Sequence, residues 1–209
     1  RKHVLNTAGH QHYYHRGQMV DQNFYHLVSG GAAWWQLWED AKDATDADLI
    51  QKTLDYWTYV IIDFAPQEQT MTAETYSLGH IKVAHNNILV DKFTVNLSQT
   101  DQPSKPGIEP ITGTLELPAV IKARPYSSPG NSEFNAAQYQ ISQSQTFDEL
   151  AYEKMLYAQN FFKDGGPAKY LPTDTQKDKQ CTELELGKYA LISGDYYVRV
   201  RFRNDNLEW

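Results

Sequence analysis

GDYYVRVRFRNDN, residues 194–206, is the stretch that most clearly indicates how this chain folds. Side chains of a β-strand point alternately to opposite faces of a sheet, and this stretch alternates with that period. Its apolar face holds Tyr196, Val198, Val200 and Phe202. The opposite face, called the arginine face below, holds Tyr197, Arg199, Arg201 and Arg203. The pattern predicts a strand that covers a hydrophobic core and presents guanidinium groups on its other side.

The composition of the chain is that of a globular protein with one substantial core. Of its 209 residues, 41% are hydrophobic and 22% are charged, and the formal net charge is −7. Proteins that bind nucleic acid over their whole surface are normally basic, so an acidic chain disfavours that class but allows one local basic face. The single cysteine, Cys181, excludes an intrachain disulfide. No apolar run is long enough for a transmembrane helix, and we expect no signal peptide.

Most of the remaining sequence predicts short β-strands separated by long loops rich in proline, glycine and asparagine. YWTYVIIDF, residues 56–64, is the clearest further strand because it is rich in aromatic and β-branched residues. Two inserted helices are also expected: a short one within residues 46–55, and a longer one over 147–161 that a capping box of Thr146 and Glu149 would begin. We therefore predict a mainly β fold, an antiparallel β-sandwich of jelly-roll type with one or two short inserted helices. Residues 1–209 are expected to form one domain, with 1–33 as an extended N-terminal segment.

The arginine face allows two interpretations. Arginine binds phosphate through its planar fork of donors, and Tyr197 on the same face offers a ring on which a base can stack. Alternatively, charged side chains keep an edge strand from pairing with other strands, or they meet acids of a neighbouring subunit. Lysine is the usual residue for edge protection, so three arginines in a row on one face favour the phosphate interpretation.

Two other clusters are candidate binding sites. GHQHYYHRG, residues 9–17, places His10 and His12 on one face of a strand, a geometry that suits a metal ion. WWQLWED, residues 34–40, is a tryptophan cluster beside acids, which fits a sugar-stacking platform or the buried anchor of a subunit contact. The motifs of serine hydrolases, P-loop proteins and zinc proteases are absent from the sequence, so we expect no enzyme, no catalytic residue, no metal and no cofactor.

The order of these features resembles the small single-jelly-roll capsid proteins of circovirus-like, circular single-stranded DNA viruses. The resemblance rests on three segments: YSLGHIKVAHNNILVDKFTVNL (76–97), TFDELAYEKMLYAQNFFKDGGPAKYLPT (146–173) and DYYVRVRFRNDNLEW (195–209). The family carries a basic N-terminal arm, of which only Arg1 and Lys2 are seen here, so we expect the rest of the arm to precede Arg1. Parvovirus-type capsid proteins share the jelly roll and are a less favoured match.

The resemblance implies a viral capsid protein that self-assembles into an icosahedral shell around the genome. Its partners would be copies of itself, viral nucleic acid on the inner face and a host-surface receptor, without membrane insertion. It would be found in the virion and, during assembly, in the host nucleus or cytoplasm. The residues expected to bind nucleic acid are Arg199, Arg201, Arg203, Arg1 and Lys2, and those expected at subunit interfaces are Trp34, Trp35 and Trp38. The alternatives are a lectin-like β-sandwich that uses the tryptophans with Tyr13 and Tyr14, and a cupin-like metal-dependent enzyme that uses His10, His12 and a distant histidine.

Overall fold

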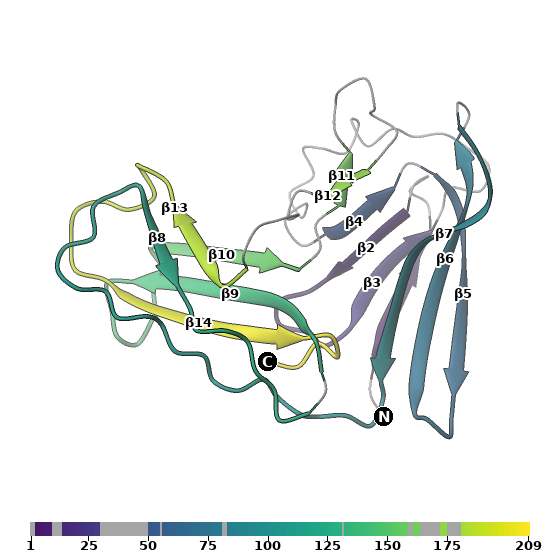
Figure 1. The fold of residues 1–209 in the computed structure, drawn as a ribbon, viewed down its shortest axis with the longest axis horizontal. Helices are drawn as coiled ribbons and strands as arrows, with labels where there is room; N and C mark the ends of the chain where they lie inside the picture. Colours follow the sequence, from purple (N-terminus) through teal and green to yellow (C-terminus); the bar gives the residue numbers. More distant parts are fainter. Residues whose placement is uncertain are drawn as a thin grey trace. The chain divides into compact units, whose positions relative to one another are not determined.

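The computed structural model describes residues 3–9, 14–29, 50–54, 56–80, 83–130, 132–158, 161–163, 172–174 and 181–209. Its regular structure within these ranges consists of fourteen β-strands, so the mainly β prediction is confirmed (Figure 1). The chain divides into two compact units, unit 1 with Arg1–Thr100 and Gln159–Lys177, and unit 2 with Asp101–Ala158 and Asp178–Trp209. The jelly-roll connectivity and the assignment of residues 1–209 to one domain remain predictions.

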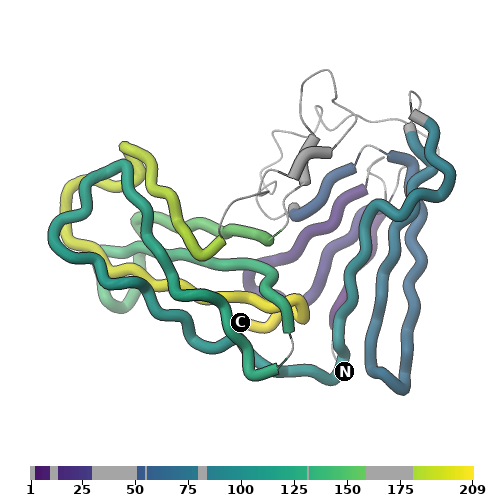
Figure 2. The backbone as a smooth tube through the Cα atoms, in the orientation of Figure 1, coloured from purple at the N-terminus to yellow at the C-terminus, as the bar shows by residue number. Residues whose placement is uncertain are grey.

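Unit 1 contains two sheets. The larger has the strand order β1-β3-β2-β4-β11-β12 and is mixed, because β1 pairs with β3, and β4 with β11, in parallel. Its strands are β1 (Leu5–Ala8), β2 (Tyr14–Gln18), β3 (Tyr25–Ser29), β4 (Ile50–Leu54), β11 (Phe161–Lys163) and β12 (Pro172–Asp174). The smaller sheet is an antiparallel meander of three long strands, β5 (Trp57–Ala65), β6 (Thr70–His80) and β7 (Val83–Asn96) (Figure 2).

The meander turns one face toward the larger sheet. Along β6, Met71, Ala73, Thr75 and Ser77 are buried, while Thr72, Glu74 and Tyr76 between them are half-exposed. The apolar contact between the two sheets includes Tyr25 of β3 and Phe93 of β7, whose ring centroids lie 4.5 Å apart. Period-2 alternation in the sequence therefore determines which face of the meander is buried.

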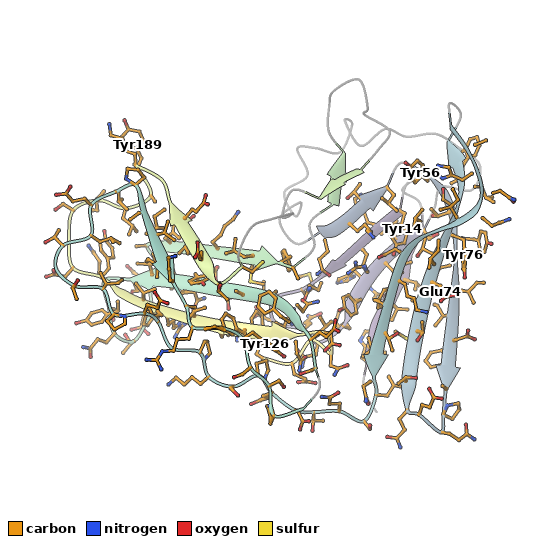
Figure 3. The ribbon with its side chains drawn as sticks, viewed as in Figure 1. Tyr14, Tyr56, Glu74, Tyr76, Tyr126 and Tyr189 are labelled. Carbon is orange, nitrogen blue, oxygen red and sulfur yellow. The ribbon has the colours of Figure 1, made fainter. Side chains whose placement is uncertain are left out.

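A buried charge network also joins the two sheets of unit 1. Asp91 of β7 accepts hydrogen bonds from Arg16 Nε at 2.6 Å, Lys52 Nζ at 3.1 Å and the Tyr14 hydroxyl at 2.7 Å. The side chains of Arg16, Lys52 and Asp91 are only 3%, 10% and 2% exposed. Tyr14 is labelled at this position in Figure 3. One carboxylate thus connects β2 and β4 of the larger sheet to β7 of the smaller one.

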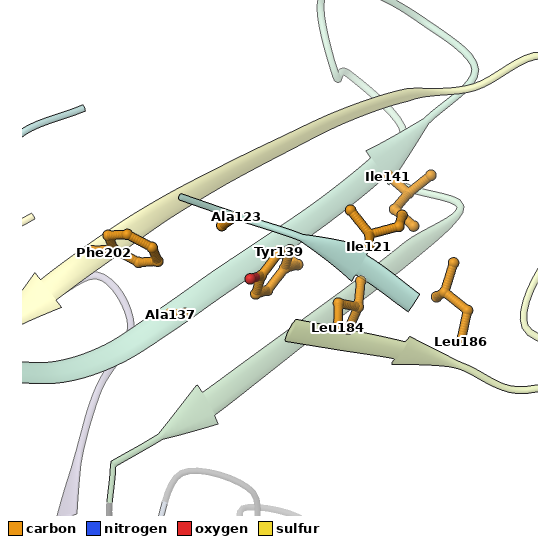
Figure 4. Packing of buried hydrophobic residues seen from close by; sticks show 8 residues of the cluster. All are labelled: Ile121, Ala123, Ala137, Tyr139, Ile141, Leu184, Leu186 and Phe202. Atoms are coloured by element: carbon orange, nitrogen blue, oxygen red, sulfur yellow. The ribbon is translucent and has the colours of Figure 1, made fainter. Parts of the chain in front are cut away.

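Unit 2 also contains two sheets, with its hydrophobic core between them (Figure 4). The first has the order β10-β9-β14 and is antiparallel, and the second is the antiparallel pair β13-β8. The strands are β8 (Ala119–Lys122), β9 (Phe134–Ser142), β10 (Tyr152–Tyr157), β13 (Glu183–Leu186) and β14 (Tyr197–Asn204). The core cluster consists of Ile121, Ala123, Ala137, Tyr139, Ile141, Leu184, Leu186 and Phe202.

The predicted helix over 147–161 is not found in residues 147–158 and 161, the part of this range that the structure describes. Within this range, Tyr152–Tyr157 forms strand β10, which pairs with β9 from Tyr152 opposite Ile141 to Tyr157 opposite Ala136. Thr146 bonds the side chains of Ser144 and Asp148 in a turn, and Phe147 has a φ of 56°, which is incompatible with a right-handed helix. The backbone of β10 therefore hydrogen-bonds to a neighbouring strand instead of to itself.

The expected helix within 46–55 is likewise not seen in the part that the structure describes. Ile50–Leu54 is strand β4, which pairs antiparallel with β2, and residues 46–49 and 55 lie outside the described residues. Four consecutive side chains of β4, from Gln51 to Leu54, are buried. No helix that could span a membrane occurs in the described ranges.

We expect loss of the Asp91 carboxylate to destabilise unit 1 strongly. Asp91→Asn leaves the charges of Arg16 and Lys52 buried without their counter-ion, which should lower the free energy of unfolding by about 3–5 kcal/mol. Glu74→Gln is the matched control, because it removes an exposed ion pair with Lys92 from the same sheet and should have a much smaller effect. Urea unfolding of both variants measures the difference, and equal losses would contradict the assignment.

Unit 1 should also lose stability in acid, in two stages. Burial lowers the pKa of His15 from its usual 6.5 to about 3. Burial alone would raise the pKa of Asp91, but the charge and hydrogen bonds of Arg16, with the charge of Lys52, lower it from 3.8 to about 2. Both groups bind protons more weakly in the folded state, so unfolding is favoured as the pH falls, first from 6.5 toward 3 and then from 3.8 toward 2.

The first stage of this acid effect is assigned to His15 by substitution. His15→Gln has no imidazole to protonate, so its stability should change less than that of the wild-type protein between pH 6.5 and 4. Urea unfolding at a series of pH values, with hydrogen exchange of the β2 amides, gives this comparison. Parallel pH profiles for the two proteins would show that His15 does not cause the loss.

Candidate nucleic-acid interface on strand β14

Strand β14 has the two faces that its sequence predicts. It lies at the edge of the sheet β10-β9-β14 and pairs antiparallel with β9. Phe202 is 1% exposed within the core of unit 2, and Val198 and Val200 pack against the same core. On the other face, Tyr197, Arg199 and Arg201 are exposed. The alternation along 196–202 is therefore confirmed.

Each exposed arginine is held by a glutamine of the neighbouring strand. Arg199 Nε donates to Gln140 Oε1 at 2.7 Å, and Arg201 Nε donates to Gln138 Oε1 at 2.5 Å. These are the residues directly opposite in the register of β14 and β9. Because a guanidinium group carries five N–H donors, the Nε bond orients the group without using the four donors of its terminal nitrogens.

A glutamate on the third strand orients both glutamines. Gln138 Nε2 and Gln140 Nε2 each donate to Glu153 Oε1 of β10 at 2.6 Å. The amide nitrogens therefore face β10, and the amide oxygens face the arginines on β14. A polar ladder of Glu153, the two glutamines and the two arginines crosses all three strands on this face.

Two aromatic rings cover the guanidinium groups. The ring of Phe147 lies 4.3 Å from Arg199 Cζ, and that of Trp209 lies 4.0 Å from Arg201 Cζ. At these distances a cation is attracted to the face of an aromatic ring. Each arginine thus has its Nε bonded to an amide and one ring face against its plane, so its position is well defined.

The loops that carry these rings have uncommon backbone conformations. Phe147 itself has a φ of 56°, and Leu207, two residues before Trp209, has a φ of 62°. Bulky residues rarely adopt this left-handed region of backbone dihedral angles. The side-chain oxygen of Asn204 accepts hydrogen bonds from the backbone N–H groups of Asn206 and Glu208 and so holds the second loop in place.

Arg203 differs from the other two arginines because it is buried. Its exposure is 0%, its Nε donates to the backbone oxygen of Leu207 at 3.2 Å, and its Cζ lies 5.0 Å from the Trp209 ring. The loop after β14 folds back over it. A guanidinium group enclosed in this way does not reach a phosphate in solution, so the accessible part of the arginine face consists of Tyr197, Arg199 and Arg201.

Several predicted site residues lie outside the described ranges. They are Arg1, Lys2, His10, His12, Tyr13, Trp34, Trp35 and Trp38. Tyr14, the other tyrosine of the proposed sugar platform, is 0% exposed and bonded to Asp91, so it offers no surface for stacking. Among the described residues, no group of three or more histidine, cysteine, aspartate or glutamate side chains is placed to hold a metal ion.

Sequence analysis missed five residues of the site: Gln138, Gln140, Phe147, Glu153 and Trp209. The polar strand QYQISQSQT, residues 138–146, carried a signal, because two of its glutamines alternate with the same period as the arginines. No sequence pattern marked Phe147 or Trp209, because both residues reach β14 from loops. No family model, curated protein or solved structure matches the chain.

The structure predicts different roles for Arg199 and Arg203. Arg203→Met removes a buried hydrogen bond and the packing against Trp209, and it should lower the free energy of unfolding by about 2 kcal/mol. Arg199→Met, the matched control on the same strand, should change it by about 0.5 kcal/mol or less. Chemical unfolding of the two variants provides the test, and equal stabilities would show that Arg203 is not structural.

Proposed function

We propose that the protein is a viral capsid protein, a jelly-roll β-sandwich that self-assembles into an icosahedral shell around nucleic acid. The observation that carries the proposal is the pair Arg199 and Arg201, exposed and oriented on one face of a sheet in a chain with a net charge of −7. A shell needs basic groups only on its inner face, so an acidic subunit with one local basic face fits this task.

The geometry of the two arginines suits phosphate. Arginine binds phosphate oxygens through two parallel N–H donors, and in both arginines the bond to glutamine is made by Nε. Because the Nε bonds and the rings already order both side chains, little conformational entropy is lost when an anion binds. Phe147 is half-buried and Tyr197 is exposed on the same face, which provides apolar surface for bases of a single strand.

Exposed apolar side chains support self-assembly. In unit 2, Val120 is 44%, Ile192 78% and Tyr189 88% exposed, and in unit 1 Phe64 is 63% exposed. Tyr189 and Ile192 border the same hollow of unit 2, and apolar side chains that gather at a protein surface are typical of contact regions. The pairing of two sheets around a core within each unit is compatible with a sandwich, and the jelly-roll topology is part of the proposal.

Substitution of both exposed arginines tests the nucleic-acid role. In Arg199→Gln/Arg201→Gln, assembled particles should contain less nucleic acid, and the slope of log K against log salt should decrease by about 1.4, since single strands lose about 0.7 per phosphate contact. Lys105→Gln/Arg124→Gln is the control, because it removes the same charge from exposed positions of unit 2 off this face. The absorbance ratio of purified particles and filter binding at several salt concentrations are the measurements.

The same experiment separates phosphate binding from edge protection. β14 is an edge strand, and charge on an edge strand prevents unwanted pairing. If the double variant aggregates or fails to assemble while its nucleic-acid binding is unchanged, the arginines protect the edge or form a subunit contact, and the phosphate role is wrong.

A further inference from the structure

Strand β5 is an edge strand with exposed apolar side chains on both faces. It lies at one end of the sheet β5-β6-β7 and is nine residues long, WTYVIIDFA. Tyr59 and Ile61, on the outer face, are 38% and 44% exposed, and Ile62 and Phe64, on the opposite face, are 36% and 63% exposed. An edge strand of this length also has a row of backbone N–H and C=O groups directed away from its sheet.

The other edge strands that the structure describes have the features that discourage pairing. β7, the opposite edge of the same sheet, carries Lys92, a left-handed Asn87 and two register shifts against β6. β14 has the arginines, β10 has Glu153 and Lys154, and the pair β13-β8 has two glutamates and a lysine. β1 and β12 have four and three residues, and β12 begins with a proline.

β5 has few of these features. Its register against β6 shifts only at its first residue, between Trp57 and Thr58. From Thr58 to Ala65 it contains no proline, no lysine or arginine, and one charged side chain, that of Asp63. Natural proteins manage exposed edges with charge, proline, bulges or short strands. A long apolar edge with so few of them, and with a regular register from Thr58 to Ala65, indicates a strand that is covered in the working form of the protein.

We infer that β5 pairs antiparallel with β5 of a second copy of this chain, about a two-fold axis perpendicular to the sheet. The strand is complementary to itself when Ile61 lies opposite Ile61 of the copy. In this register Val60 lies opposite the copy's Ile62 on one face, and Tyr59 lies opposite its Asp63 on the other. The two Asp63 carboxylates are then four residues apart along the strands, about 14 Å, which exceeds the screening length in physiological salt.

A cavity beside β5 is consistent with a second copy of β5 at this edge. A cavity of about 450 Å³ lies between the sheets of unit 1, lined by Val60 and Ile62 of β5 and by Thr7, Ala8, Leu27 and Ser29 of β1 and β3, with Gly9. The copy's Ile62, opposite Val60, lies on the face of the sheet that borders this hollow. Pairing thus adds backbone hydrogen bonds and apolar contact at one edge.

In a shell, this pairing is a two-fold contact between subunits, and that role rests on the proposed function. The pairing itself is argued from β5 and the cavity beside it. The arginine face on β14 belongs to unit 2 and takes no part in it. The two proposals therefore have separate residues and separate tests.

Ile61→Lys tests the pairing in the full chain. It places two lysines opposite each other at the two-fold axis, and like charges there should lower the association constant by about tenfold or more. Leu89→Lys is the matched control, since Leu89 is 46% exposed on β7, the opposite edge of the same sheet, and its replacement should leave association unchanged. Sedimentation velocity over a range of concentrations measures association, and circular dichroism verifies that the variants fold.

Ile61→Cys gives an independent readout. Cβ atoms of directly opposed residues in an antiparallel pair lie about 4.5–5.5 Å apart, so mild oxidation should produce a covalent dimer. Leu89→Cys, with the native buried Cys181 present in both variants, should remain uncrosslinked. The inference is overturned if Ile61→Lys associates like the wild-type protein or if Ile61→Cys stays monomeric on gels.

The outcomes distinguish the two proposals. If Ile61→Lys abolishes a dimer but electron microscopy of the wild-type protein never shows particles, the β5 pairing stands and the capsid proposal fails. If particles of Ile61→Lys form as in the wild-type protein, the pairing fails and the capsid proposal stands.

Discussion

Unit 1 depends on one buried carboxylate. Asp91 holds Arg16 and Lys52 and so joins a strand of the three-stranded meander to two strands of the larger sheet. Such a network adds little net free energy compared with apolar packing, but an arrangement that separates its charges is strongly disfavoured. It therefore favours one placement of the meander on the larger sheet, the one that keeps Asp91 of β7 in contact with Arg16 of β2 and Lys52 of β4.

The main structural feature of unit 2 is a set of contacts that orders two exposed cations. A long arginine side chain at a surface is normally mobile, yet Arg199 and Arg201 are each held by an amide oxygen and an aromatic ring. The amide orientation depends in turn on Glu153. One negative charge on the far strand thus positions two positive charges on the near edge, and an acidic protein obtains a defined basic surface in this way.

Local patterns predicted the strands well and the surroundings of side chains poorly. The alternation in 196–202 identified both faces of β14, because the period of a strand is a local property. The burial of Arg203 was not predictable, because it depends on a loop that folds back and on Trp209. The helix predicted over 147–161 failed because pairing with β9 overrides a capping motif. The Arg16 and Asp91 pair joins residues 75 positions apart, which no local pattern marks.

The difference between the two edges of the meander determines how far association can proceed. A two-fold pair formed through β5 would be a continuous six-stranded sheet with β7 at both ends. Each end would then present the lysine and the irregular pairing of β7. Edge-to-edge growth would stop at two copies, because the surface that attracts a partner is used up in the first contact. The chain would then have one edge that pairs with a second copy and no free edge on that sheet from which a fibre could grow.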